Sequence, residues 1–236
     1  MISALADSAS FRDPSGRVYL LDGRVFRTVT PLAAGDFEYV RGTGLVDRLI
    51  ADGHLVEEKR VPADALGPPA EAVHCVLEHP RLAFISYPYE WTFAGLKAAA
   101  LLHLDIHLRA LAKDVTLSDA SAYNIQFLGP RPVFIDHLSF RRYRPGEYWI
   151  GHQQFCQQFL NPLLLRSATG VAHNAWYRGS QEGIGVVELD SLLPLRSKFS
   201  WKMFAHVVLQ ARLQSAGTRS KSRTSTPSRP LPKSAF

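Results

Sequence analysis

The feature that most constrains the fold is a long segment that would be apolar on nearly every side of a helix. Thr92 is a suitable N-cap for a helix that runs from Phe93 to Lys113. The apolar residues of this segment include Leu96, Ala99, Ala100, Leu104, Ile106, Leu108 and Leu111. A helix that is apolar all round is stable only when other elements cover most of it. We therefore expect it at the centre of a folded unit.

The chain before this helix predicts a small β-rich region. Two β-rich runs flank Asp22-Gly23, which favours a tight hairpin because a type I′ turn requires positive φ at both central residues. A helical region follows Pro31 and is expected to end at Gly53. Further strands are predicted at residues 55–61, 72–77 and 82–86. We expect residues 10–90 to form a small, mostly β unit with one helix.

The chain after the central helix predicts a mostly helical region. A polar loop at residues 114–124 is followed by a second hairpin around Gly129-Pro130. Helical segments are expected at residues 148–166, 189–195 and 199–213, and Pro162 is expected to kink or end the first of them. The predicted class is α+β, with the helical region at residues 91–214.

The net charge of +6 depends on the end of the chain. Five basic residues and no acidic one follow Ala216, so the remainder has 22 Lys and Arg against 21 Asp and Glu. Residues 215–236 are rich in Ser, Thr, Pro and Arg, and we expect a disordered basic tail. The sequence shows no basic patch or motif typical of nucleic-acid binding, so no nucleic-acid partner is predicted.

The rest of the composition favours a cytoplasmic protein. No stretch of 18 apolar residues predicts a transmembrane segment, and the first residues lack a basic region followed by an apolar one. The two cysteines, Cys75 and Cys156, have neither metal-ligand nor redox spacing, so we expect two reduced thiols.

Three polar residues carry the candidate chemistry. Asp119 and Asn124 lie in the polar loop five positions apart, and Asp136 ends the apolar strand that follows. A carboxylate can receive or orient the proton of an acceptor hydroxyl, and carboxylate and amide oxygens are suitable ligands for Mg²⁺. Asp119 and Asn124 are also compatible with turn or cap positions, since Asp and Asn are common there.

The order of these elements resembles that of protein kinases and aminoglycoside phosphotransferases. The resemblance covers roughly residues 15–170, and the kinase catalytic loop also has Asn five residues after Asp. It implies a two-lobed kinase-like fold, with a small mostly β N-lobe and a mostly helical C-lobe. It also implies Asp119 as the catalytic residue, Asn124 and Asp136 as metal ligands, and Mg²⁺ and ATP as cofactors.

The region expected to hold the nucleotide departs from the kinase pattern. The sequence has no Gly-x-Gly-x-x-Gly loop and no clear Val-Ala-Ile-Lys strand. Arg27 is the best candidate for the cation that pairs with phosphate, with Glu38 or Asp47 as its expected partner. Tyr87 and Tyr89 lie at the expected junction between the lobes, where we predict cofactor binding. Packing of the junction is the alternative role for these two rings.

A second resemblance concerns the stretches 84–91, 119–128, 132–136 and 154–163. They are similar to the N-terminal half of bacterial proteins named class I S-adenosylmethionine-dependent methyltransferases, a group that includes a host-specific nodulation protein of rhizobia. The sequence lacks a Gly-rich nucleoside-binding turn, so we do not expect S-adenosylmethionine to bind this chain.

Two functions therefore remain open at this point. The first is a phosphotransferase that uses Mg-ATP on a small hydroxyl-bearing substrate. The second is a pseudokinase-like module with a binding or regulatory role toward a methyltransferase partner.

Overall fold

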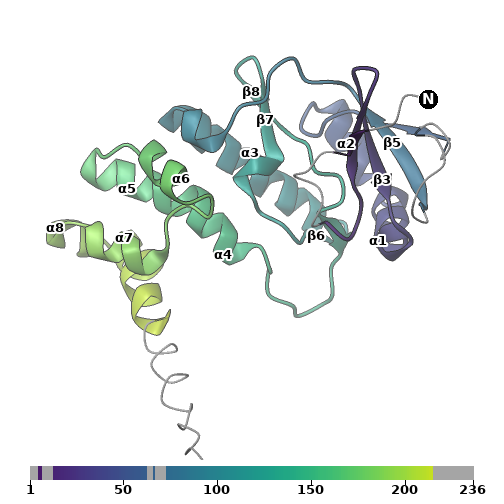
Figure 1. Cartoon of the computed structure of the whole chain (residues 1–236). Helices are drawn as coiled ribbons and strands as arrows, with labels where there is room; N and C mark the ends of the chain where they lie inside the picture. Colours follow the sequence, from purple (N-terminus) through teal and green to yellow (C-terminus); the bar gives the residue numbers. More distant parts are fainter. Residues whose placement is uncertain (1–4, 7–12, 63–65, 67–72, 215–236) are drawn as a thin grey trace, which may run out of the picture.

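The hairpin expected at Asp22-Gly23 is present in the computed structural model, which describes residues 5–6, 13–62, 66 and 73–214 (Figure 1). Asp22 and Gly23 have φ values of 50° and 75°, as the tight turn requires. The hairpin belongs to a five-stranded antiparallel sheet with the order β1-β2-β3-β5-β4. Its strands are β1 (Leu5–Ala6), β2 (Val18–Leu21), β3 (Arg24–Val29), β4 (Lys59–Val61) and β5 (Cys75–His79).

Two helices, rather than the single one expected, connect β3 to β4. They are α1 (Pro31–Gly42) and α2 (Leu45–Ala51). Gly44 separates them with a φ of 69°, a conformation that favours glycine. A small core packs α1 against the sheet through Val29, Phe37, Cys75 and Leu77. This sheet-containing region therefore has its own apolar centre.

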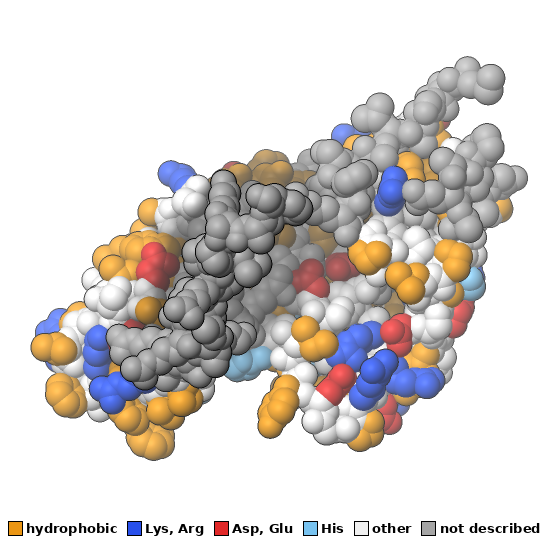
Figure 2. Space-filling model, turned by 60° about the horizontal axis from the view of Figure 1, so that its bottom comes forward, with side chains coloured by type: hydrophobic (Ala, Val, Ile, Leu, Met, Phe, Trp, Pro, Cys, Tyr) orange, Lys and Arg blue, Asp and Glu red, His pale blue; other side chains and the backbone are white. Residues whose placement is uncertain are grey.

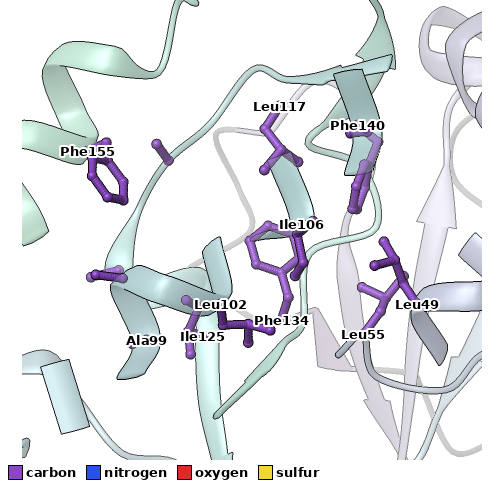
Figure 3. Close-up of a cluster of buried hydrophobic side chains, with 14 of the residues drawn as sticks. Leu49, Leu55, Ala99, Leu102, Ile106, Leu117, Ile125, Phe134, Phe140 and Phe155 are labelled. Atoms are coloured by element: carbon purple, nitrogen blue, oxygen red, sulfur yellow. The ribbon is translucent and has the colours of Figure 1, made fainter. Parts of the chain in front are cut away.

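The central helix α3 (Phe93–Leu111) agrees closely with the prediction. The Thr92 hydroxyl accepts a hydrogen bond from the Gly95 amide at 3.1 Å, so Thr92 is the N-cap. Short strand pairs lie beside α3: β6 (Val115–Leu117) with β9 (Phe140–Arg142), and β7 (Ile125–Leu128) with β8 (Arg131–Phe134). Figure 3 shows Ile106 of α3 meeting Phe134, with Leu49 and Leu55 from the sheet-containing region close by. The main core thus joins the two regions.

The remaining helices follow the β9 strand (Figure 1). They are α4 (His152–Phe155), the π-helical turn η5 (Cys156–Leu160), α5 (Asn161–Thr169), α6 (Asn174–Gly179), α7 (Val186–Leu192), α8 (Leu195–Lys198), α9 (Trp201–Met203) and the π-helical turn η6 (Phe204–Val208). Pro162 does not end the helix, because α5 continues through it. The wider π-helical turn η5 directly precedes α5 and is the local irregularity near this proline. A second core contains Leu165, Ile184, Leu189, Leu193 and Val207.

One predicted strand was wrong. Residues 82–86 form an irregular segment in which Phe84 is 69% exposed. The backbone of Ser86 is paired with a side chain instead of a strand, since the Gln126 amide accepts from its N–H at 2.8 Å and donates to its carbonyl at 3.0 Å. The expected tail at 215–236 lies outside the described residues, as does most of the loop around Gly67.

The surface agrees with the near-neutral charge of the chain before the tail. On the face shown in Figure 2, several Lys and Arg side chains gather at the lower right, with Asp and Glu side chains directly beside them. Arg24 pairs with Glu78, and Arg141 pairs with Glu147. Within the described residues, no helix has the length and apolar character needed to cross a bilayer.

Buried histidines make the stability of the fold sensitive to moderate acid. Burial lowers the pKa of His79, His103 and His107 to about 4, and for His79 the neighbouring His137 acts in the same direction. The unfolded chain would bind protons near pH 6.5, whereas the folded chain binds them only near pH 4. The contribution of these neutral histidines to the free energy of unfolding is therefore fully present above pH 6.5. It falls as the pH falls from 6.5 to 4, by up to about 1.4 kcal/mol per pH unit for each group.

Urea unfolding at pH 7.5 and pH 5.0 tests this expectation. His103 is fully buried among the rings of Phe134, Trp149, Phe155 and Phe159. The His103→Phe variant should therefore lose less stability between these two pH values than the parent protein. Equal stability of the parent protein at both values would contradict the prediction.

Candidate functional site

The three residues singled out in the sequence come together in the structure. The Asn124 amide nitrogen lies 3.1 Å from Asp119 Oδ2 and 3.5 Å from Asp136 Oδ2. Asp119 precedes the short 3₁₀ helix η4 (Ala122–Asn124), and Asp136 follows β8. Asn124 therefore lies between two carboxylates that are 17 positions apart in the sequence.

The loop that carries Asp119 is held by local contacts and by two glutamines. The Asp119 carboxylate accepts from the Ser121 amide at 2.9 Å. The side-chain oxygens of Gln154 and Gln158 accept from the amides of Ala120 and Ala122, each at 2.8 Å. These glutamines are one helical turn apart on α4 and η5, and Gln158 is only 3% exposed.

Asp136 is held by its own turn and by the Asn124 backbone. The carboxylate accepts from the Leu138 amide at 3.1 Å, and the Asp136 carbonyl accepts from the Ser139 hydroxyl at 3.1 Å. The Ile135 amide donates to the Asn124 carbonyl at 2.9 Å. The backbones on which Asn124 and Asp136 lie are thus directly joined, which fixes the separation of the two side chains.

Arg27 of β3 supplies the positive charge of the site. Its Nη1 lies 2.9 Å from Asp136 Oδ1, and its Nη2 lies 2.6 Å from Asp13 Oδ2. The Arg27 side chain is 14% exposed, and its Nε has no hydrogen-bond partner among the described residues. Glu38 is not its partner, contrary to expectation, because Glu38 pairs with Arg60 and His74. Asp47, the other expected partner, is not one of the two carboxylates that bind Arg27.

Asp13 is brought to Arg27 by a close approach between two chain segments. The Thr28 amide donates to the Arg17 carbonyl, and the Thr30 amide donates to the Ser15 carbonyl, both at 2.9 Å. A Cβ atom on Gly16 would lie 1.8 Å from the Thr28 carbonyl oxygen, so only glycine allows this approach. The sequence alone gave no indication of the Asp13–Arg27 pair.

A second charged cluster, which sequence reasoning missed, lies close to the end of β8. Glu58 pairs with Arg41, and its Oε2 lies 3.1 Å from His137 Nδ1. Burial alone would raise the pKa of Glu58, but His137 and Arg41 outweigh burial and lower it to about 2. His137 Nε2 lies 2.8 Å from the Val56 carbonyl oxygen. The cluster therefore ties the residue after Asp136 to the sheet-containing region.

Tyr87 and Tyr89 lie in the segment that connects the sheet-containing region to α3. They belong to or flank the 3₁₀ helix η3 (Pro88–Glu90), and their rings stack on each other at 5.3 Å with an interplanar angle of 6°. Among the described residues, no hydrogen bond or ring contact joins either tyrosine to Asp119, Asn124 or Asp136. Their assignment to cofactor binding stays a prediction.

The donor set at the centre of the site is compatible with Mg²⁺. Asn124 and Asp136 offer an amide and a carboxylate group, and Mg²⁺ prefers such hard oxygen ligands. A half-turn about the last side-chain torsion of Asn124 exchanges the positions of its amide nitrogen and oxygen. The oxygen would then lie where the nitrogen lies now, between the two carboxylates, as metal binding requires. Within the described residues, no three His, Cys, Asp or Glu side chains form a metal cluster. A metal here would depend on Asn124.

The comparisons with known proteins add one strong sequence match. No family model matches the chain. The chain is 46% identical over 232 residues to nodulation protein NoeA of Rhizobium meliloti (strain 1021). The match covers 97% of this chain and 48% of NoeA, so the chain spans about half the length of this curated relative. The resemblance to a rhizobial nodulation protein is confirmed, whereas its methyltransferase part stays a prediction.

A solved structure, the Cydia pomonella granulovirus kinase PK-1, also matches, with a TM-score of 0.43 and 11% identity. That match covers 74% of this chain and 70% of the kinase chain. A structural likeness of this degree does not by itself assign a fold. The expected mixture of a small sheet region and a helical region is confirmed. The two-lobed arrangement stays a prediction.

Proposed function

We propose that this chain is a kinase-like phosphotransferase module that uses Mg-ATP on a small hydroxyl-bearing substrate. The observation that carries the proposal is the convergence of Asp119, Asn124 and Asp136 beside the Arg27 guanidinium. Phosphoryl transfer requires mainly positioning and charge stabilisation, and these four groups are of the types required. In the proposed arrangement, the sheet-containing region is the N-lobe and the helical region is the C-lobe.

Each group has a distinct role in this proposal. Asp119 orients the acceptor hydroxyl and receives its proton. Asn124 and Asp136 would hold Mg²⁺, which when bound would neutralise the charge of the phosphates. Arg27 binds a phosphate through its planar guanidinium, which can donate two parallel hydrogen bonds.

The Asp13–Arg27 pair bears directly on nucleotide binding. Both Nη atoms of Arg27 already contact carboxylates, so a phosphate that approaches these two atoms competes with Asp13 and Asp136. Asp13 is the more exposed partner, with 31% of its side chain accessible compared with 14% for Asp136. We therefore expect nucleotide binding to displace Asp13, while Asp136 remains near the metal.

A thermal-shift titration tests the proposed function. With Mg²⁺ present, ATP at about 100 times its Kd should stabilise the folded chain by about 2.7 kcal/mol. For a chain of this size, such a stabilisation raises Tm by several degrees. Asp136→Ala should remove the shift, whereas Asp190→Asn, a change at the distant Lys198 pair, should retain it. The absence of an Mg²⁺-dependent shift with ATP, GTP, CTP and UTP would overturn the proposal.

The second candidate function is a non-catalytic module that binds or regulates a partner such as a methyltransferase. The observation in its favour is that Arg27 is already neutralised by Asp13 and Asp136 without any phosphate. The match to only half of NoeA is also compatible with a module of a larger assembly. ATP turnover that disappears in Asp136→Ala would exclude this alternative. Binding of S-adenosylmethionine is not part of either proposal.

A further inference from the structure

The last helices of the described chain carry exposed apolar side chains that the candidate site does not use. They lie in residues 195–214, which hold α8, α9, η6 and the helical residues 209–214 that continue from η6. Figure 1 shows α7 and α8 at the opposite end of the molecule from the sheet. Six large apolar side chains of this segment are exposed, namely Leu195, Phe199, Trp201, Phe204, Leu209 and Leu213. We refer to these six as the distal apolar side chains.

Several of the distal apolar side chains project into solvent although the segment also has a buried side. Val207 belongs to the second core, and Met203 packs against that core. In contrast, Leu195, Phe199 and Trp201 are 77% to 88% exposed. Single exposed apolar residues are common on protein surfaces, whereas a concentration of them marks a surface that contacts another molecule.

The aromatic and aliphatic members of this group are close neighbours. The Trp201 and Phe204 rings stack on each other with centroids 6.3 Å apart. Leu195 and Phe199 are four positions apart along α8 and its C-cap, which places them about one helical turn from each other. Each pair therefore offers a contact area larger than that of one side chain.

The charge of the same segment is entirely basic. Residues 195–214 contain two Lys and two Arg and no Asp or Glu. Together with residues 215–236 they hold nine basic residues and no acidic one, whereas residues 1–194 hold 18 Lys and Arg against 21 Asp and Glu. At the left end of Figure 2, hydrophobic side chains lie directly beside Lys and Arg side chains. The distal apolar side chains thus lie where the positive charge of the chain is concentrated.

Part of this positive charge is available to a partner. Arg196 and Arg212 are exposed, and neither forms an ion pair with another residue that the structure describes. The preceding helix α7 carries Asp190, but Lys198 pairs with that carboxylate at 3.0 Å. The acidic side chain closest in sequence to the segment is therefore already neutralised by the segment itself.

An anionic lipid surface fits both properties of the segment. Exposed aromatic and Leu side chains enter the boundary between head groups and acyl chains, and Lys and Arg attract anionic head groups. Trp is favoured at this boundary because its ring is apolar with one polar group. The net negative charge of residues 1–194 is repelled by the same surface, so the molecule would approach a bilayer with this end first.

We propose that residues 195–214 bind the surface of an anionic bilayer, with Phe199 and Trp201 inserted at the level of the head groups. The basic residues of 215–236 would add to the attraction through their charge alone. This binding does not depend on the proposed function, since it concerns where the chain is held and not which reaction it performs.

Co-sedimentation of the full chain with lipid vesicles tests the proposal. At about 0.1 M salt, the chain should bind vesicles of phosphatidylcholine with about 30% phosphatidylglycerol and should not bind vesicles of phosphatidylcholine alone. Raising the salt to about 1 M shortens the Debye length to about 3 Å and should weaken the binding at least about tenfold. Tryptophan emission should shift to shorter wavelength on binding, because Trp201 leaves water.

Paired variants separate the apolar contribution from the charge. Phe199→Ser with Trp201→Ser should weaken vesicle binding at least about tenfold, because two large side chains no longer leave water. Arg196→Gln with Arg212→Gln should weaken it about fivefold for each residue. The matched control is Phe84→Ser with Leu101→Ser, which removes two exposed apolar side chains elsewhere and should bind like the parent protein. The Tm of each variant should stay within about 2 °C of the parent value, since all the positions are exposed.

Four results would overturn the proposal. They are no binding to the phosphatidylglycerol vesicles, equal binding to the neutral vesicles, equal weakening in the control variant, and unchanged binding of Phe199→Ser with Trp201→Ser. A dimer in sedimentation velocity that this last variant abolishes, without vesicle binding, would assign the distal apolar side chains to a second copy instead. Titration with Mg-ATP separates the two proposals: vesicle binding without nucleotide binding rejects the proposed function only, and the reverse rejects the membrane surface only.

Discussion

An Asp119→Asn variant is expected to lose about 10²–10⁴-fold in kcat for phosphoryl transfer, the usual contribution of a positioned general base. The amide keeps the size of the side chain and one oxygen that can accept from the Ser121 amide. It lacks the basicity to receive the proton of the acceptor. Because Asp119 is not assigned to the metal, the Mg²⁺-dependent shift of Tm with ATP should persist.

The measurement is hydrolysis of labelled ATP, alongside transfer of the labelled phosphate to small hydroxyl-bearing acceptors. Asp190→Asn serves as the control for a carboxylate-to-amide change elsewhere. If Asp119→Asn retains the parent kcat, Asp119 is not the catalytic base. If it loses the thermal shift instead, Asp119 belongs to the metal site.

Phe134→Ala is expected to lower the free energy of unfolding by about 3–5 kcal/mol, the range for removing a buried aromatic ring. Phe134 is fully buried, and its ring meets those of His103 and Phe140 with centroids 5.7 and 5.8 Å away. Figure 3 shows it at the centre of the side chains that join α3 to the sheet-containing region. The cavity left behind would remain open because neighbours from several elements cannot all move inward.

Urea unfolding of this variant should be compared with that of Phe84→Ala, which removes the same group from a position that is 69% exposed. The control should change stability by no more than about 0.5 kcal/mol. Similar losses in the two variants would contradict the placement of Phe134 in the main core. Phe134 also precedes Asp136 by two positions, so its loss should weaken the nucleotide-dependent shift of Tm as well.

Much of the local structure could be predicted because its signals lie within a few residues. The Asp22-Gly23 turn, the Thr92 cap and the apolar character of α3 each depend on short-range chemistry, and all three are present. The strand predicted at residues 82–86 was wrong because its β propensity is offset by a distant side chain, Gln126, that pairs with the backbone. The effect of Pro162 on its helix likewise depends on context, since a π-helical turn precedes the proline and accommodates it.

The sequence by itself determined the types and spacing of the site residues, Asp119, Asn124 and Asp136. Only the tertiary structure decided what surrounds them: the Asp13–Arg27 pair and the glutamines that hold the loop. These contacts join positions that are 14 to more than 30 residues apart. Turns and caps follow from neighbouring residues, whereas an ion pair or a buried glutamine depends on how complete elements pack. The long apolar helix predicted that other elements must pack around it. Which polar groups this packing brings together was decided only by the folded structure.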